Sequence, residues 1–169
     1  VKGRSQIVRL VLQGRSVTLV DDTYNANPDS VLAAIDVLAG MEAPRWLVLG
    51  DMGEVGTRGP AFHAEVGERA RDRGIEHLWC AGALSIDAAR AFGTAARHFA
   101  GTQELLALLQ QRAQEVPAAA SVLVTLASMV RSLSAARSLP ATRMVKRPSA
   151  ATLPVYSVLL TVRVTMSPA

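Results

Sequence analysis

The sequence has little of several residue types, and each shortage excludes a class of protein. One cysteine, Cys80, occurs in 169 residues, which excludes an internal disulfide framework and a zinc site built on paired cysteines. Lys2 and Lys146 are the two lysines, and no Gly-Lys-Ser/Thr triplet occurs, so the lysine of a P-loop is missing. No window offers the roughly 20 apolar residues of a membrane span, and the opening VKGRSQIVRL lacks the apolar core of a secretory signal. We therefore expect a cytoplasmic protein without a membrane span.

Acidic residues are absent from the last third of the chain. All 14 lie at or before Glu115, where 12 basic residues leave a net charge of −2. Residues 116–169 hold 6 basic residues, no acid and no glycine, whereas 54 residues of ordinary composition contain about 6 acids. Two explanations are open: a basic arm that binds nucleic acid or membrane, or a reading frame that selection did not shape. The basic residues form no stripe, so we expect no nucleic-acid partner.

The remaining pattern predicts alternating strands and helices. Two β-rich runs, residues 7–12 and 16–20, flank Gly14 and predict a hairpin. Further strands are predicted over residues 45–49, 77–81, 96–99 and 121–125. A helix is predicted from Pro28 to Gly40, with Asn27 as its cap. Three more helices are predicted over residues 62–73, 85–92 and 102–115. In the helix over residues 62–73, Phe62, Val66 and Ala70 lie on one face. This order predicts an α/β fold: a Rossmann-like, mostly parallel sheet with helices on both faces, preceded by a β-hairpin and followed by an irregular C-terminal tail.

Two polar loops each follow a predicted strand. Residues 21–27 read Asp-Asp-Thr-Tyr-Asn-Ala-Asn, and residues 50–56 read Gly-Asp-Met-Gly-Glu-Val-Gly. Because parallel strands end at one edge of a sheet, we expect the two loops to share that edge. Carboxylates there can accept hydrogen bonds from a ribose or hold a metal through water. The alternative is that the same residues shape turns and cap helices.

The histidines give weaker signals. No pair among His63, His77 and His98 has metal-ligand spacing, so we predict no metal site in this chain. His63 begins a helix beside the glycine-rich loop and is within reach of it, whereas the other two flank strands and are interpreted as structural. No G-x-S-x-G elbow occurs, so Ser-His-Asp catalysis has no support.

Taken together, these stretches resemble the C-terminal domain of the Mur ligases of bacterial cell-wall synthesis, over roughly residues 1–124. The resemblance rests on Gly3-Arg4, VTLVDDTYNANPDS at 17–30, AAIDVL at 33–38, VLGDMGE at 48–54 and HAEVG at 63–67. The strings DDTYNANP and LGDMGE are typical of the branch of the family that adds D-alanyl-D-alanine.

The resemblance implies a mechanism and a set of site residues. Such ligases use ATP and Mg²⁺, held mainly by a central domain that this chain lacks, to phosphorylate the terminal carboxylate of UDP-N-acetylmuramoyl-tripeptide. The amine of D-Ala-D-Ala then attacks and releases phosphate. The matching nucleotide-binding positions are Arg4, Asp22, Tyr24, Asn25 and Asn27, and those placed towards the dipeptide amine are Asp51, Glu54 and His63. The resemblance implies no catalytic residue here, and we expect the isolated chain to ligate nothing.

The resemblance ends at Val124. The family continues with a Lys-Gly-Ser-Arg segment, whereas this chain continues with Thr-Leu-Ala-Ser-Met. We hypothesise that residues 125–169 form an atypical basic tail, poorly ordered and produced by a frameshift or a misassembled gene. The rival interpretation of the whole chain is a non-catalytic α/β module that binds a nucleotide or a protein.

Overall fold

In the part of the chain that the structure describes, six strands form one sheet at the centre of the molecule. The computed structural model describes residues 6–12, 14–22, 27–112, 115 and 117–125. The strand order is β1-β2-β6-β3-β4-β5, with bounds β1 Gln6–Leu12, β2 Arg15–Asp21, β3 Arg45–Gly50, β4 His77–Ala81, β5 Ala96–Phe99 and β6 Ser121–Thr125. Only the β1–β2 pair is antiparallel, and the other four neighbouring pairs are parallel. The predicted mostly parallel α/β sheet is confirmed.

The antiparallel pair is the predicted hairpin. Its register pairs Leu12 with Arg15 and Ile7 with Val20. Gly14 lies in the turn with φ of 75°, a left-handed conformation that glycine adopts without steric cost. The hairpin extends the sheet at the β2 edge.

The first helix, α1 (Pro28–Ala39), begins and ends where the sequence indicates. The Asn27 side-chain oxygen accepts a hydrogen bond from the Ser30 N–H at 2.9 Å, and Pro28 occupies the first turn, where its missing N–H costs nothing. Gly40 follows the last turn and donates its N–H to the carbonyl of Val37. The predicted cap and stop are therefore confirmed.

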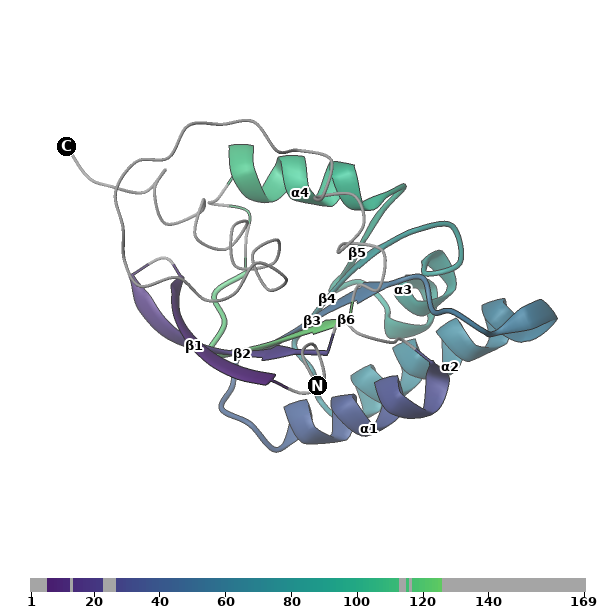
Figure 1. Ribbon diagram of the computed structural model, residues 1–169, viewed down its shortest axis with the longest axis horizontal. Helices are drawn as coiled ribbons and strands as arrows, with labels where there is room; N and C mark the ends of the chain where they lie inside the picture. Colours follow the sequence, from purple (N-terminus) through teal and green to yellow (C-terminus); the bar gives the residue numbers. More distant parts are fainter. Residues whose placement is uncertain (1–5, 13, 23–26, 113–114, 116, 126–169) are drawn as a thin grey trace.

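Helices cover both faces of the sheet (Figure 1). The helices α1, α2 (Gly59–Asp72) and α3 (Ile86–Phe92) lie on one face, and α4 (Thr102–Gln111) lies on the other. Strand β3 contributes alternately to the two cores: Leu47 and Leu49 pack under the three helices, whereas Trp46 packs on the α4 side. This alternation follows from the two-residue period of a strand, and burial on both faces explains the almost unbroken apolar run.

Two helix boundaries differ from the sequence expectation by more than one residue. Helix α2 begins at Gly59 instead of residue 62, because Pro60 fits its first turn, and a short 3₁₀ turn, η1 (Gly56–Arg58), precedes it. Helix α4 ends at Gln111 instead of residue 115. Of the predicted apolar face of α2, Val66 and Ala70 are fully buried, and Phe62 packs against the same core while staying partly exposed beneath the Arg58 guanidinium. His63 is fully buried as well, which the apolar spacing did not predict.

Several expectations fall outside the described residues. These are the proposed tail from residue 126 onward and three of the nucleotide-binding candidates, Arg4, Tyr24 and Asn25. Within the described part of the chain, no helix is long and apolar enough to cross a bilayer.

Candidate functional site

The two acidic loops emerge at the same edge of the sheet. Strand β6 lies between β2 and β3 and runs parallel to both, with Val124 opposite Asp21 on one side and opposite Val48 on the other. Asp22 directly follows β2, and Asp51 directly follows β3. Two strand spacings separate them, roughly 10 Å across the sheet. The expectation that both loops share the carboxyl edge is confirmed.

Asp22 occupies the β2 side of this edge. Its exposed fraction is 9%, and its backbone N–H donates to the Val124 carbonyl at 3.0 Å. Helix α1 starts at the same edge, so the partial positive charge of its N-terminus lies nearby. Asn27 uses its side-chain oxygen to cap that helix. The capping alternative therefore holds for Asn27, while the nucleotide-binding roles of Asp22 and Asn27 stay predictions.

Asp51 is bound to the neighbouring loop. Its Oδ1 accepts hydrogen bonds from the backbone N–H groups of Leu84 at 3.0 Å and Ser85 at 2.8 Å, at the start of α3. Gly82 faces the same carboxylate, and a Cβ at position 82 would overlap the carboxyl group. Asp51 thus ties the loop after β3 to the loop after β4.

His63 holds the same loop from the other side. Its Nδ1 donates to the Gly59 carbonyl at 2.7 Å, because a carbonyl oxygen can only accept. Its Nε2 therefore accepts the Met52 N–H, at 3.0 Å. The ring is fully buried with both nitrogens engaged, so it contacts the loop and no solvent. His63 is close to the glycine-rich loop, as the sequence indicated, and its placement towards the dipeptide amine stays an untested prediction.

Glu54 differs from the other two candidates at this loop. Its side chain is exposed, as is Gly53 beside it. Its backbone has φ of 59°, a left-handed conformation that is uncommon for residues with a Cβ. Glu54 therefore carries an accessible carboxylate at the tip of the loop.

Sequence reasoning missed the loop after β4. The Gly82 carbonyl accepts hydrogen bonds from Ser85 Oγ at 3.1 Å and from His98 Nε2 at 2.7 Å. Gly82 also has φ of 133°, which L-residues rarely adopt. A glycine directly after a strand, followed by a serine before a helix, was the available signal.

Cys80 lies beneath this loop and is unsuited to act as a nucleophile. Burial raises the pKa of its thiol to about 11. Its Sγ donates to the Ser85 carbonyl at 3.2 Å. A thiol with so high a pKa remains protonated and unreactive at neutral pH.

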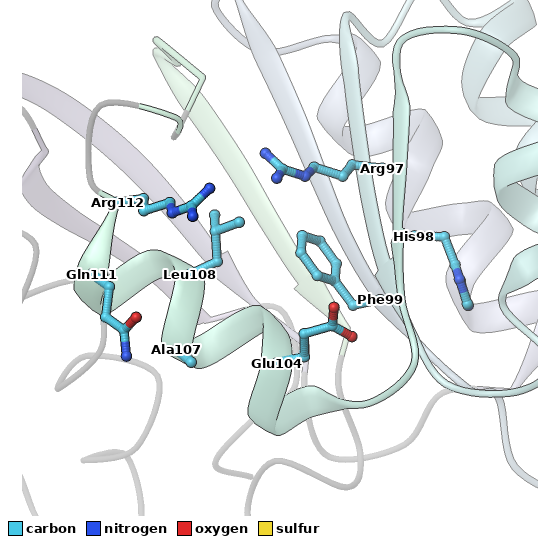
Figure 2. Close-up of a pocket in the computed structure, with 8 residues that line it drawn as sticks. All are labelled: Arg97, His98, Phe99, Glu104, Ala107, Leu108, Gln111 and Arg112. Atoms are coloured by element: carbon cyan, nitrogen blue, oxygen red, sulfur yellow. The ribbon is translucent and has the colours of Figure 1, made fainter.

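A pocket of about 400 Å³ lies between β5 and α4 (Figure 2). Arg97 and Arg112 reach towards each other across it, while His98 points away. Glu115 binds both guanidinium groups, at 2.7 Å and 3.0 Å, and these hydrogen bonds, Arg97 first, hold its pKa below the ordinary value. The shared glutamate offsets much of the positive charge that an anionic ligand would need.

The acidic side chains at the carboxyl edge offer hydrogen-bond acceptors. Among the described residues, no three His, Cys, Asp or Glu side chains are grouped closely enough to hold a metal. The carboxylates of Asp22 and Glu54 are instead spread along the edge. Carboxylate oxygens accept hydrogen bonds from hydroxyl and ammonium groups.

Comparison with known protein families identifies the family of this chain. The family model described as "Mur ligase, glutamate ligase domain" matches residues 3–144. The chain belongs to the Mur ligase family. The match runs beyond residue 124, where the recognisable motifs end, and so includes part of the segment that we proposed as an atypical tail.

Curated relatives point to one branch of the Mur ligases. UDP-N-acetylmuramoyl-tripeptide–D-alanyl-D-alanine ligase of Escherichia coli is 42% identical over 92 residues, which are 54% of this chain and 20% of the relative. The enzyme of the same name from Haemophilus influenzae is 50% identical over 68 residues, 40% of this chain and 14% of the relative. The chain thus spans about a fifth or less of these relatives' length.

Solved Mur ligase structures share the fold. A crystal structure of MurF from Acinetobacter baumannii superposes with a TM-score of 0.63 at 26% identity, covering 75% of this chain and 27% of that one. MurF ligase from Thermotoga maritima in complex with ADP gives a TM-score of 0.59 at 24% identity, covering 75% and 27%. The described sheet is therefore the sheet of a Mur ligase C-terminal domain.

Proposed function

We propose that this chain is the nucleotide- and acceptor-facing domain of an ATP-dependent ligase that joins D-Ala-D-Ala to UDP-N-acetylmuramoyl-tripeptide. The observation that carries the proposal is the shared carboxyl edge, where Asp22 and the loop bearing Asp51 and Glu54 lie on either side of β6. The substrates are those named for the curated relatives.

In this proposal the β2 side of the edge faces the nucleotide. Asp22 accepts hydrogen bonds from the ribose hydroxyl groups, and Arg4 neutralises phosphate charge with its guanidinium. Tyr24, Asn25 and Asn27 complete the nucleotide-facing loop. Mg²⁺ belongs with the phosphates and is held by the central domain of the enzyme, which also supplies the P-loop.

The β3 side of the edge faces the incoming dipeptide. An ammonium group is attracted to a carboxylate, and the loop after β3 offers one exposed carboxylate, Glu54. The domain works as a lid: its closure brings both loops to the reacting groups and excludes water from the site. The chain contributes binding and orientation, and it ligates nothing without its partner domains.

Reconstitution from separate parts tests this function. The UDP-binding and central domains of the E. coli relative are supplied in trans, and phosphate release is measured with UDP-tripeptide, D-Ala-D-Ala and ATP-Mg²⁺. We expect release only when this chain is present. Asp22→Asn should raise the KM for ATP on the order of tenfold, the worth of one charge-assisted hydrogen bond.

A matched control removes a carboxylate far from the edge. Asp72 ends α2, at the opposite edge of the sheet, and its side chain is 65% exposed. Asp72→Asn should leave the KM for ATP unchanged. No phosphate release with the wild-type chain would favour the rival interpretation, a non-catalytic nucleotide- or protein-binding module.

A further inference from the structure

The loop after β3 is fixed at its base and exposed at its tip. Asp51 and Met52 form the base, where Met52 is 3% exposed. Gly53 and Glu54 form the tip, and both are exposed. The backbone of Glu54 is in the left-handed region, which a residue with a Cβ seldom adopts by itself. Contacts at the base of the loop must therefore hold the tip in this conformation.

One anchor of the base is the Asp51 carboxylate. It accepts two backbone N–H groups, those of Leu84 and of the N-cap residue Ser85, directly before α3. These bonds use the oxygen atom Oδ1, which an asparagine side chain also offers. The absence of a side chain at Gly82 makes room for the carboxylate.

The second anchor is the His63 ring. It accepts the Met52 N–H and donates to the Gly59 carbonyl, so it joins the loop base to the start of α2. The two anchors therefore act on neighbouring residues and tie the loop base both to the segment before α3 and to α2.

We propose that Asp51 and His63 are positioning residues that together clamp the loop after β3, and that Glu54 is the residue that contacts the amine of the acceptor. The contact of Glu54 with the acceptor rests on the function proposed above, whereas the clamp does not. Asp51, Glu54 and His63, which the sequence analysis grouped together, thus have different roles: two hold the loop and Glu54 contacts the acceptor. Gly82 also contributes to the clamp, because its lack of a side chain leaves space for the Asp51 carboxylate.

Amide hydrogen exchange in the chain by itself tests the Asp51 anchor. Asp51→Ala and Gly82→Ala should each speed exchange of the Leu84 and Ser85 amides on the order of tenfold or more, because both variants remove or displace the acceptor. Asp51→Asn should retain protection. Gly53→Ala is the matched control, since a Cβ there meets nothing within 4 Å. Equal exchange in Asp51→Ala and wild type, or equally fast exchange in Asp51→Asn and Asp51→Ala, would overturn the anchor.

The His63 anchor is tested at a different amide. His63→Ala should expose the Met52 N–H to exchange, again on the order of tenfold or more. His63→Gln offers a side-chain oxygen near the position of Nε2 and should restore part of the protection. Unchanged exchange at Met52 in His63→Ala would overturn this anchor, and the Gln variant decides the question where the Ala variant fails to fold.

The reconstituted ligase separates positioning from direct contact. Glu54→Gln should raise the KM for D-Ala-D-Ala at least tenfold with unchanged stability, and Asp51→Asn should leave that KM unchanged. A KM for Asp51→Asn as high as that of Glu54→Gln, with the Leu84 and Ser85 amides still protected, would show that the Asp51 charge acts on the substrate and would overturn its positioning role. Absence of ligation in the wild-type mixture would refute the proposed function and the role of Glu54, while amide exchange would still decide the clamp.

Discussion

Replacing Gly67 by alanine tests how closely α2 and α3 must approach. Gly67 is buried in the middle of α2, against the backbone of Ala88 in α3. An added Cβ would overlap the Ala88 carbonyl oxygen and lie 2.9 Å from both its carbonyl carbon and its Cα. Backbone atoms cannot rotate away as a side chain can, so one helix has to move.

Two opposing effects set the magnitude. Alanine favours the helix over glycine by about 1 kcal/mol. Overpacking of a filled site costs about 1–3 kcal/mol or more, and three backbone contacts place Gly67→Ala at the upper end. We therefore expect a net loss of about 2 kcal/mol, equivalent to a fall in Tm of roughly 4–8 °C for a chain of this size.

Urea unfolding followed by circular dichroism measures this loss directly. The control is Glu68→Ala in the same helix, an exposed position where we expect a change within about 0.5 kcal/mol. The Met52 amide should also lose protection in Gly67→Ala, because α2 carries His63 one turn earlier. A Gly67→Ala protein as stable as wild type would refute the close packing of the two helices.

Two further predictions concern titratable groups. Cys80, with its raised pKa and full burial, should resist alkylation by iodoacetamide at pH 8 in the folded protein and react once urea unfolds it; rapid labelling without denaturant would contradict its burial. Burial alone would raise the pKa of Glu76, but hydrogen bonds from Arg45 outweigh it and hold the pKa below the ordinary 4.5. A carboxyl group with a lowered folded-state pKa stabilises the fold above its unfolded pKa and loses that contribution as the pH falls through the folded value. The stability difference between wild type and Glu76→Gln should therefore be largest at neutral pH and shrink below about pH 4 in urea titrations; a pH-independent difference would contradict the ion pair.

Local signals predicted most element boundaries. Asn27 and Pro28 specify the start of α1 and Gly40 its end through cap geometry, which depends on only a few neighbouring residues. Gly14 specifies the hairpin in the same way. The start of α2 was missed because the run of apolar spacing begins after Pro60, although proline suits a first turn.

The order of the strands and the burial of His63 depend on contacts that form only in the folded chain, so they could not be predicted from local patterns. The position of β6 between β2 and β3 depends on strands about 100 residues and about 75 residues away in the chain, which local patterns do not record. His63 was missed as a buried residue for a related reason. Its burial is acceptable only because the Met52 N–H and the Gly59 carbonyl satisfy its ring, and those partners appear only in the folded structure.

The position of β6 also determines when the sheet can form during synthesis of the chain. β1 and β2 are synthesised first, and β3, β4 and β5 next, yet the two groups share no strand-to-strand contact until residues 121–125 enter between them. On the ribosome, the nascent domain would remain as two half-sheets with facing unpaired edges until its final strand emerges. A premature stop before Ser121 would leave those edges open to other chains, whereas a change of reading frame after Thr125 spares all the strands that the structure describes.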